Sequence, residues 1–338
     1  MNRIVRNRSH QATKGTRPNI NLPKPAIRTR LAVLLACFAA FAFPLTGLAE
    51  KRPYIIVVTH GQVSDPFWAV VKNGVDQAAK DCGADVEYRA SEKFDMVTLA
   101  QLIDAAVVAK PDGLAVTIPD ADALGGAIQR AVQAGIPVIS LNSGSDVSKK
   151  LGCLLHVGQD EYIAGKRGGE RMKALGINKA VVINQEVGNA GLDLRTRGFI
   201  DTVGSGSQVL PVPTDFTAAR EAVSAFLQKN PDIDALLTLG PTDVEAVLQA
   251  LEQTGKLGKV KFATFDLSPA VLQAIEKKQM DFAIDQQQYL QGYLPVVFLT
   301  NFARYGLMPA NDIVLTGPLF VTSDTVKQVV DLTKKGIR

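Results

Sequence analysis

The strongest constraint on the fold is a regular alternation of strand and helix patterns that begins at Pro53 and continues to Tyr305. Residues Tyr54–Thr59 form a continuous apolar, β-branched run, as expected for a strand that is buried on both faces. The segment Pro66–Asp81 then places apolar residues at helical spacing and ends before Gly83. Alternation of this kind predicts parallel sheets with helices on both faces.

The alternation divides into two successive series, each about 100 residues long. The first series continues with predicted strands at Asp85–Arg89, Gly113–Ile118, Pro137–Leu141 and Leu154–Val157 and predicted helices at Met96–Ala109 and Ala121–Ala134. The second series predicts strands at Ala180–Asn184, Gln208–Val212, Ala235–Leu239, Lys261–Phe265 and Asp281–Ile284. Its predicted helices are Tyr162–Leu175, Leu192–Val203, Ala218–Lys229, Asp243–Gln253, Pro269–Lys277 and Leu290–Tyr305. The sequence therefore predicts an α/β protein with two similar Rossmann-like lobes.

The formal charge of +4 is concentrated at one end of the chain. Residues 1–49 hold eight basic side chains and no acidic one, so residues 50–338 carry 29 basic and 33 acidic groups. The predicted lobes have no surplus of cations to neutralise phosphates, which argues against a general nucleic-acid binder.

The same 49 residues have the pattern of an export signal. Leu31–Phe43 is a run of 13 apolar residues that follows Arg28 and Arg30, and Gly47-Leu48-Ala49 supplies small residues at the −3 and −1 positions. The run is about 20 Å long as a helix, too short for a bilayer core of about 30 Å. We expect cleavage after Ala49 and a periplasmic location, with a retained anchor or a lipidated Cys37 as alternatives.

Cysteine and histidine are scarce after residue 49, which limits the chemistry available. Cys82 and Cys153 could form a bridge in an oxidising compartment, but two separate buried thiols are the preferred interpretation. His60 and His156 have no cysteine pair near them, so we expect neither a metal site nor a cofactor.

The carboxyl ends of parallel strands are where ligands bind in such folds. After the first strand, two aromatic residues, Phe67 and Trp68, open the next helix. Adjacent helix residues are not expected to point into the same core, so at least one should face the cleft, where a flat ring can cover the C–H face of a sugar. The alternative is that both simply pack the start of the helix.

Polar residues follow several other strands. Asn142 and Ser143 come after one strand, and Asp266 and Gln286 follow two more. A fourth strand is followed by Gln185, Glu186, Asn189, Asp193 and Arg195. Each could be only a helix cap or a turn residue. Together, carboxylates, amides and one arginine suit a neutral ligand that is rich in hydroxyl groups.

The usual catalytic and nucleotide-binding patterns are missing. The chain has no Gly-x-Gly-x-x-Gly or Gly-x-x-x-x-Gly-Lys loop, no Gly-x-Ser-x-Gly elbow and no His-Glu-x-x-His. A carboxylate pair for glycoside hydrolysis needs no local motif and stays possible. We nevertheless expect a binding protein rather than an enzyme.

These features resemble the ribose-type periplasmic sugar-binding proteins, which are the solute receptors of ATP-driven importers. The resemblance covers residues 53–320 and rests on the leader, Asp-Pro-Phe-Trp at 65–68, Ala-Gly-Ile-Pro-Val-Ile-Ser at 134–140, Gly-Gln-Asp-Glu-Tyr-Ile-Ala-Gly at 158–165 and Phe-Asp at 265–266. It implies the type I periplasmic binding protein fold, with two lobes joined by three crossing segments. The implied lobes are residues 50–157 with 287–312 and residues 158–286 with 313–338, with hinges near Val157–Gln159, Gln286–Gln288 and Asn311–Val314.

The resemblance also implies a binding site. Phe67 and Trp68 match the aromatic clamp of the family, and Phe216 matches its second aromatic residue. Arg195 is the best match for the arginine of the second lobe, although Asp193 fits the spacing equally well. The implied ligand-binding residues are His60, Asp65, Phe67, Trp68, Asn142, Ser143, Asn189, Asp193, Arg195, Phe216, Asp243, Asp266 and Gln286.

Departures from the family pattern bear on the ligand. Ser143 replaces a common arginine and Pro241 replaces an aspartate, so a pentose other than ribose, a hexose or a sugar alcohol is expected. The implied partners are the permease subunits of an ABC importer, and we expect a monomer. The alternatives are a periplasmic receptor for a sensor kinase or chemoreceptor and, if the first 49 residues are retained in the cytoplasm, a sugar-responsive repressor.

Overall fold

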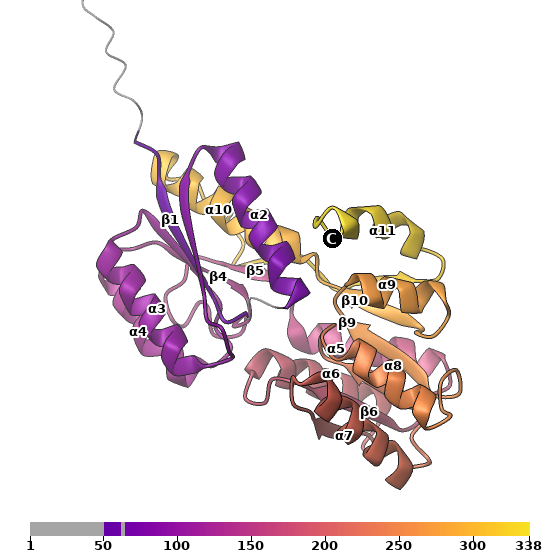
Figure 1. Ribbon diagram of the computed structural model, residues 1–338. Helices are drawn as coiled ribbons and strands as arrows, with labels where there is room; N and C mark the ends of the chain where they lie inside the picture. The colour runs from indigo at the N-terminus through magenta and orange to yellow at the C-terminus, as the bar shows by residue number, and fades with distance from the viewer. Residues whose placement is uncertain (1–50, 62–64) are drawn as a thin grey trace, which may run out of the picture. The chain divides into compact units, whose positions relative to one another are not determined.

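The computed structural model describes residues 51–61 and 65–338, which form two parallel-dominated sheets with helices packed on both faces of each (Figure 1). The predicted leader at 1–49 lies outside the described residues. No helix of the described ranges is both long enough and apolar enough to cross a bilayer.

The first lobe is built on a six-stranded parallel sheet with the order β11-β5-β4-β3-β1-β2. Its strands are β1 (Tyr54–Thr59), β2 (Asp85–Ala90), β3 (Gly113–Val116), β4 (Val138–Asn142), β5 (His156–Gly158) and β11 (Ile313–Leu315). Its helices are α2 (Pro66–Cys82), α3 (Met96–Ala109), α4 (Ala121–Gln133) and α10 (Gln288–Tyr305).

The period-2 alternation of β1 separates the two cores of this lobe. Ile56 and Val58 pack with α3 and α4 on one face, whereas Ile55 and Val57 pack with α2 and α10 on the other. All four side chains are at most 1% exposed. A strand that must be apolar on both faces cannot alternate polar and apolar residues, which is why its sequence is a continuous apolar run.

The second lobe repeats the plan with the strand order β12-β10-β9-β8-β6-β7. Its strands are β6 (Ala180–Asn184), β7 (Gln208–Pro211), β8 (Ala235–Thr238), β9 (Lys261–Phe265), β10 (Phe282–Asp285) and the antiparallel edge strand β12 (Leu319–Thr322). Helices α5 (Glu161–Ala174) and α6 (Ala190–Val203) cover one face. The helices on the other face are α7 (Phe216–Lys229), α8 (Val244–Gln253), α9 (Pro269–Glu276) and α11 (Val326–Lys334).

Helices α5 and α6 touch backbone to backbone because glycines lie at their crossing. A Cβ atom on Gly165 would lie 1.9 Å from the carbonyl oxygen of Arg195, and one on Gly198 would lie 2.1 Å from that of Tyr162. No larger residue fits at either position without separating the helices. This contact fixes where the first turn of α5 lies relative to the middle of α6.

The chain crosses between the lobes three times, and one predicted boundary was wrong. The first crossing lies between β5 and α5, and the second lies between β10 and α10. The third was placed near Asn311–Val314, but β11 pairs with β5 of the first sheet, so the crossing falls at 316–318. The elements after Tyr305, namely β11, β12 and α11, had not been predicted, because three- and four-residue strands around Gly317-Pro318 carry little periodic signal.

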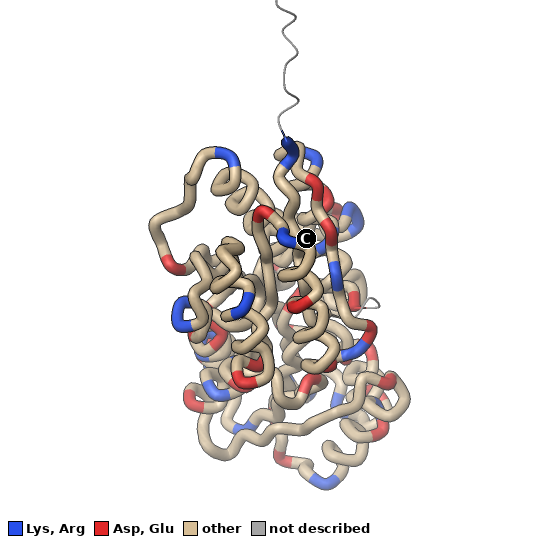
Figure 2. The backbone as a smooth tube through the Cα atoms, turned by 90° about the vertical axis from the view of Figure 1, so that its left-hand side faces the viewer, with Lys and Arg blue, Asp and Glu red and all other residues tan. Residues whose placement is uncertain are grey.

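Two other features bear on the sequence interpretation. Cys82 and Cys153 are both free thiols, as preferred over a bridge. Figure 2 shows basic and acidic residues interspersed along the described chain in that view, without a segregated basic region. This distribution agrees with the absence of surplus positive charge after residue 49.

Candidate functional site

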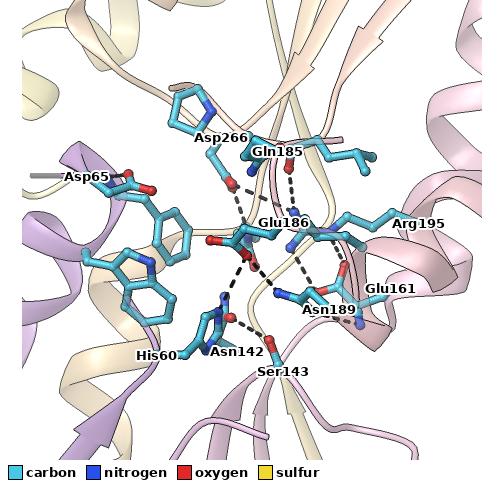
Figure 3. Close-up of a pocket in the computed structure, with 18 residues that line it drawn as sticks. His60, Asp65, Asn142, Ser143, Glu161, Gln185, Glu186, Asn189, Arg195 and Asp266 are labelled. Atoms are coloured by element: carbon cyan, nitrogen blue, oxygen red, sulfur yellow. Dashed lines mark hydrogen bonds and ion pairs between the residues drawn. The ribbon is translucent and has the colours of Figure 1, made fainter. Parts of the chain in front are cut away.

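A cavity lies where the carboxyl ends of strands from both sheets meet, at the position expected for a ligand in α/β folds (Figure 3). Its empty space, counted together with the open solvent at its mouth, is about 400 Å³. The first lobe contributes His60, Asp65, Phe67, Trp68, Asn142 and Ser143. The second lobe and the crossings contribute Glu161, Gln185, Glu186, Asn189, Gly191, Leu192, Arg195, Leu239, Gly240, Pro241, Asp266 and Gln286.

An aromatic wall from the first turn of α2 forms the apolar side. The Phe67 and Trp68 rings meet edge to face with 5.0 Å between centroids, and the His60 ring meets Trp68 at 4.8 Å. Both aromatic residues line the cavity, and both also belong to the core cluster shared by α2 and α10. The expectation that these adjacent residues could not both enter one core was therefore wrong. Phe67 and Trp68 lie in the first turn of a helix that starts beside the cavity, so both rings contact the core and the cavity.

Arg195 and Glu161 form a buried ion pair on the opposite side. The guanidinium donates through Nε and Nη2 to the two carboxylate oxygens of Glu161, the Nη2 bond being 3.0 Å, and through Nη1 to the carbonyl oxygen of Leu239 at 2.9 Å. It also lies over the Phe265 ring, 4.6 Å from the centroid. Arg195 is 4% exposed and Glu161 is 3% exposed, so the pair is held out of water by its own hydrogen bonds.

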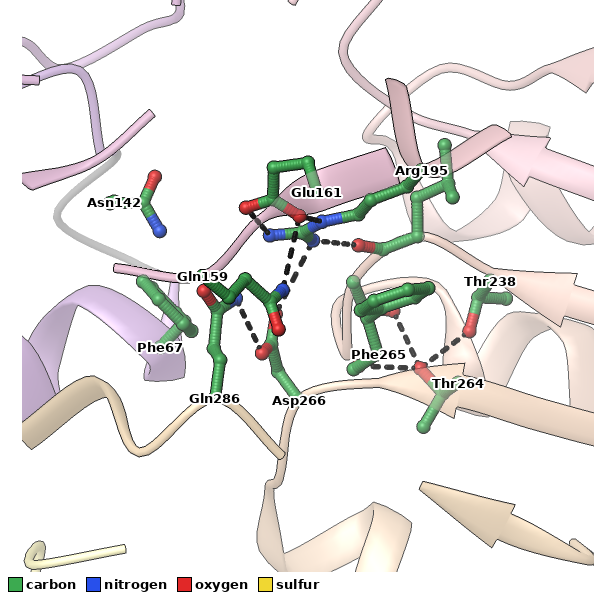
Figure 4. A network of polar contacts seen from close by, with 12 residues as sticks. Phe67, Asn142, Gln159, Glu161, Arg195, Thr238, Thr264, Phe265, Asp266 and Gln286 are labelled. Atoms are coloured by element: carbon green, nitrogen blue, oxygen red, sulfur yellow. Dashed lines mark hydrogen bonds and ion pairs between the residues drawn. The ribbon is translucent and has the colours of Figure 1, made fainter. Parts of the chain in front are cut away.

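A chain of amide hydrogen bonds continues from this pair to the first lobe, and Figure 4 shows its beginning at Arg195, Asp266 and Gln286. Asp266 Oδ2 lies 3.9 Å from Arg195 Nη1, and Asp266 Oδ1 accepts from Gln286 Nε2 at 2.7 Å. Gln291 donates to Gln286 Oε1 at 2.8 Å and accepts from Asn142 Nδ2 at 3.1 Å. The network therefore passes through the second crossing segment and joins polar groups of both lobes.

Two of these residues have unusual backbone conformations. Asn142 ends β4 with φ 62°, and Asp266 follows β9 with φ 68°. Asn and Asp tolerate the left-handed region better than other residues with a Cβ, and such conformations concentrate at ligand sites. Asn142 and Asp266 therefore occupy equivalent positions in the two lobes, at the carboxyl ends of β4 and β9.

Burial dominates the electrostatics of the cavity. It raises the pKa of Asp65 to about 6 and those of Glu186 and Asp266 to about 7, with Arg195 opposing the shift of Asp266. The pKa of His60 is lowered to about 3, mainly by burial and to a smaller extent by repulsion from Arg195. This ring is therefore neutral. Arg195 is then the single cation among the described lining residues.

Several predicted residues also have structural roles. Asp65 is the N-cap of α2 and accepts from the Phe67 backbone N–H at 2.9 Å, and Asn189 caps α6 by accepting from the Gly191 N–H at 3.0 Å. Ser143 donates to Asn142 Oδ1 at 2.9 Å. Asp65 and Asn189 are therefore helix caps that also line the cavity.

The structure does not bring three predicted residues into the cavity wall. Asp193 is exposed on the outer side of α6, so of the two alternatives only Arg195 lines the cavity. Phe216 is 39% exposed at the start of α7 and lies outside the cavity lining. Asp243 is 2% exposed but does not line the cavity, although Gly240 and Pro241, which shortly precede it in the chain, do.

Some lining residues were not among the predicted ligand-binding residues. Gln185 and Glu186 directly follow β6, and the rule of polar strand ends does identify them, although the family resemblance did not include them in the implied site. Glu161 gave no such signal, because it lies in the first turn of α5, where an acidic residue commonly serves only the helix dipole.

The cavity has both donors and acceptors available for a ligand. The Asn142 amide, the Ser143 hydroxyl and the Gln286 amide each donate to a neighbouring side chain, but an amide nitrogen has two N–H groups, and Arg195 uses three of its five. Carboxylate oxygens and the unpartnered Gln185 Oε1 supply acceptors. The site is therefore suited to a ligand that has one apolar face and several hydroxyl groups, which both donate and accept.

Comparison with known proteins gives a consistent result. The family described as periplasmic binding protein domain matches residues 55–306. The xylose/arabinose-binding protein XylF of Sulfolobus acidocaldarius is 25% identical over 297 residues, covering 82% of this chain and 73% of its own. The D-allose-binding periplasmic protein of Escherichia coli is 27% identical over 255 residues, covering 71% of this chain and 81% of its own.

A solved structure is more similar. The crystal structure of a carbohydrate transporter from Acidothermus cellulolyticus 11B, in complex with myo-inositol, is 36% identical in sequence and has a TM-score of 0.81. The alignment covers 85% of this chain and 100% of that chain.

Proposed function

The chain belongs to the periplasmic binding protein family, and on that premise we propose that it is the solute receptor of an ABC sugar importer. The ligand is a monosaccharide or sugar alcohol, bound in the cavity between the two lobes. The observation that carries this proposal is the pairing of the Phe67–Trp68 wall with the polar wall around Arg195 and Asp266. A polyhydroxylated ring presents one apolar face and a rim of hydroxyl groups that donate and accept, which is the complement of that cavity.

Cyclic polyols are the first ligands to test. The structure that is 36% identical holds myo-inositol, a ring with a hydroxyl on every carbon. The two sugar-binding relatives described above are less similar in sequence. This order of similarity favours an inositol or a closely related cyclitol over xylose, arabinose or allose.

Contacts between the lobes support a mechanism in which closure traps the ligand. The Ala190 backbone N–H donates to the carbonyl oxygen of Pro119 at 2.9 Å, and Thr242 donates to Asp65 at 3.4 Å, each joining one lobe to the other. A ligand that contacts both walls would favour this closed form, which the permease subunits of the importer would then recognise. Export with loss of residues 1–49 and a monomeric state in the periplasm belong to the same proposal.

A thermal-shift panel of inositols, pentoses, hexoses and alditols tests the function. At a ligand concentration 100 times Kd the stabilisation is about 2.7 kcal/mol, which corresponds to roughly 5–10 °C in Tm for a chain of this size. We expect at least one cyclic polyol to produce such a shift. If no member of the panel raises Tm at millimolar concentration, the ligand belongs to another class.

The site assignment is tested by comparing two aspartates. Asp266→Ala should weaken binding of the identified polyol by about tenfold to 100-fold, because the Gln286 amide and Arg195 lose their acceptor and the ligand loses a buried one. Asp193→Ala on the exposed side of α6 is the matched control and should bind normally by isothermal titration calorimetry. A larger loss for Asp193→Ala than for Asp266→Ala would refute the assignment.

Acidification is expected to strengthen the binding of a neutral polyol. The acids of the closed cavity have pKa values of about 6–7, above the ordinary value of about 4 that they regain when the cleft opens to water. The closed form therefore takes up protons, and affinity should fall, by about tenfold or more, as the pH rises from about 5 to about 7. The charged and titratable groups concerned are His60, Asp65, Glu161, Glu186, Arg195, Asp243 and Asp266.

Calorimetry across that pH range measures both the affinity and the proton uptake, from the dependence of the heat on buffer ionisation. An affinity that stays constant between about pH 5 and about pH 7 would contradict the linkage.

A further inference from the structure

Residues 335–338, which follow α11, leave the second lobe in a fixed direction. Helix α11 packs with α9 in the core of that lobe. Directly after the helix, the Gly336 N–H donates to the Thr333 carbonyl oxygen at 3.0 Å. The Ile337 N–H donates to the Leu332 carbonyl oxygen, also at 3.0 Å. These bonds close a tight turn with Gly336 at φ 65°, and the turn directs the segment toward α2 of the first lobe (Figure 1).

The Arg338 side chain attaches the segment beside the second crossing. Its Nε donates to Asp285 Oδ2 at 2.7 Å, and the Gln287 backbone N–H donates to Oδ1 of the same carboxylate at 2.9 Å. Asp285 ends β10 and is 0% exposed, so Arg338 neutralises a carboxylate that water does not reach. The next residue, Gln286, donates to Asp266 in the cavity at 2.7 Å. The ion pair therefore lies one residue away from the ligand site.

The same segment contacts helix α2 of the first lobe. Asn73 Nδ2 donates to the carbonyl oxygen of Gly336 at 3.1 Å. The approach is close, since a Cβ atom on Gly336 would lie 2.3 Å from Asn73 Nδ2. Ala69 and Val70 of α2 line one surface groove together with Asn73, Gly336 and Arg338, and none of these five residues lines the ligand cavity. The segment thus joins the two lobes at a place separate from the cavity.

This contact depends on the relative position of the lobes. Asn73 moves with the first lobe, whereas Gly336 is fixed to the second lobe by α11 and by the Arg338–Asp285 pair. A rotation about the three crossings changes the distance between atoms that different lobes carry, and a hydrogen bond weakens steeply with distance and angle. An interaction that one conformation makes and another does not shifts the population toward the first.

From these contacts we propose that residues 335–338 act as a clasp that favours the closed form. Arg338 fixes the segment at the second crossing, and the Gly336 carbonyl holds α2 through Asn73. The effect on the ligand rests on the proposed function, because a larger closed population raises the apparent affinity and slows release. The effect on the lobes needs no ligand, so it is measured separately.

Amide hydrogen exchange of the ligand-free protein tests the clasp directly. The Ala190 N–H donates across the cleft to the Pro119 carbonyl oxygen, so its exchange rate reports separation of the lobes. Asn73→Ala removes a hydrogen bond between the lobes and should raise that rate by about twofold to tenfold. Lys335→Ala, which removes an exposed cation of the same segment, is the matched control and should leave the rate unchanged.

Removing the anchor should have at least as large an effect. Arg338→Ala leaves Asp285 buried without this cation, so the segment should lose its position and exchange at Ala190 should rise. Thermal melts establish that each variant is folded. Asn73 is exposed on α2, so Asn73→Ala decides the question if Arg338→Ala does not fold. An unchanged rate at Ala190 in Asn73→Ala overturns the clasp, even if exchange rises within residues 331–338, because the segment would then stabilise only its own lobe.

The release rate tests the consequence for binding. With myo-inositol as the probe, Trp68 fluorescence in stopped flow should show dissociation that is faster by about twofold to tenfold in Asn73→Ala and unchanged in Lys335→Ala. Equal release rates in the two variants would overturn the effect on the ligand.

The outcomes separate this inference from the function on which it rests. If no polyol binds but exchange at Ala190 responds as expected, the receptor function fails and the clasp between the lobes stands. If a polyol binds and exchange at Ala190 does not respond, the clasp fails and the receptor function stands.

Discussion

Replacing Glu161 with alanine is expected to destabilise the protein by about 3–5 kcal/mol, because it removes the bidentate partner of the buried Arg195 guanidinium and leaves only the Asp266 carboxylate, 3.9 Å away. Arginine cannot escape this penalty by losing its proton at any accessible pH. Without Glu161 the Arg195 guanidinium should also leave its position against Leu239 and Phe265, so ligand binding should be lost together with stability. Chemical denaturation and calorimetry measure the two effects.

Removing the other partner should cost less. In Arg195→Met the remaining Glu161 carboxyl can take up a proton, because burial already raises its pKa. The difference between the two variants should therefore widen as the pH falls. A double variant, Glu161→Leu with Arg195→Met, should recover part of the lost stability, since neither charge is then buried.

Glu170→Ala is the matched control for this series. Glu170 lies on the same helix, α5, with its carboxylate exposed and 4.0 Å from Lys166. Exposed pairs of this kind contribute little, so no measurable change is expected. If Glu161→Ala were as stable as Glu170→Ala, the buried pair would not have the role assigned to it.

Replacing Trp68 with alanine is the second change with a large expected effect. The ring packs against His60 and Phe67 and covers Gly61, where an added Cβ would lie 2.0 Å from Trp68 Cγ. Truncation should cost about 3–5 kcal/mol of stability. Loss of the ring should also weaken binding, because the cavity loses part of its apolar wall and Phe67 and His60 lose the ring against which they pack.

Fluorescence offers a direct measurement for this site. Trp68 is the only tryptophan of the chain, so a ligand-dependent change in tryptophan emission must come from the cavity wall. Trp68→Phe keeps an aromatic face and should retain more affinity than Trp68→Ala. Phe216→Ala, an aromatic truncation outside the cavity lining, should bind the ligand normally; a comparable loss there would contradict the proposed wall.

Much of the fold could be predicted from the sequence, and the family match confirms both the resemblance and the two-lobed α/β architecture. Buried parallel strands such as Tyr54–Thr59 have a distinctive composition, and the helices between them have a clear period. The segment after Tyr305 could not be predicted in the same way. Strand β11 is partly exposed and only three residues long, and its sheet depends on its pairing with β5, far away in the chain.

Site residues that directly follow a strand could be predicted from the sequence. Residues whose position depends on which side of a helix they occupy, or on the place of their strand in the sheet, could not. Arg195 and Asp193 are two residues apart on α6 and so point to different sides, which spacing alone could not resolve. Phe216 follows β7, the edge strand of its sheet, and an edge strand ends away from the crevice between the sheets. Glu161 is found only through its partner, since nothing local distinguishes it from an ordinary acid at a helix start.

The glycine contact between α5 and α6 has a kinetic consequence. Because no side chain separates these helices, Glu161 and Arg195 move as one body, and Leu239 and Asp266 approach the same guanidinium from their own sheet. Half of the site is thus assembled within one lobe before any ligand arrives. The ligand should bind first to this half of the site, so that Glu161, Arg195 and Asp266 govern the association rate. Trp68 and Asn142 on the other lobe should then govern the residence time of the ligand.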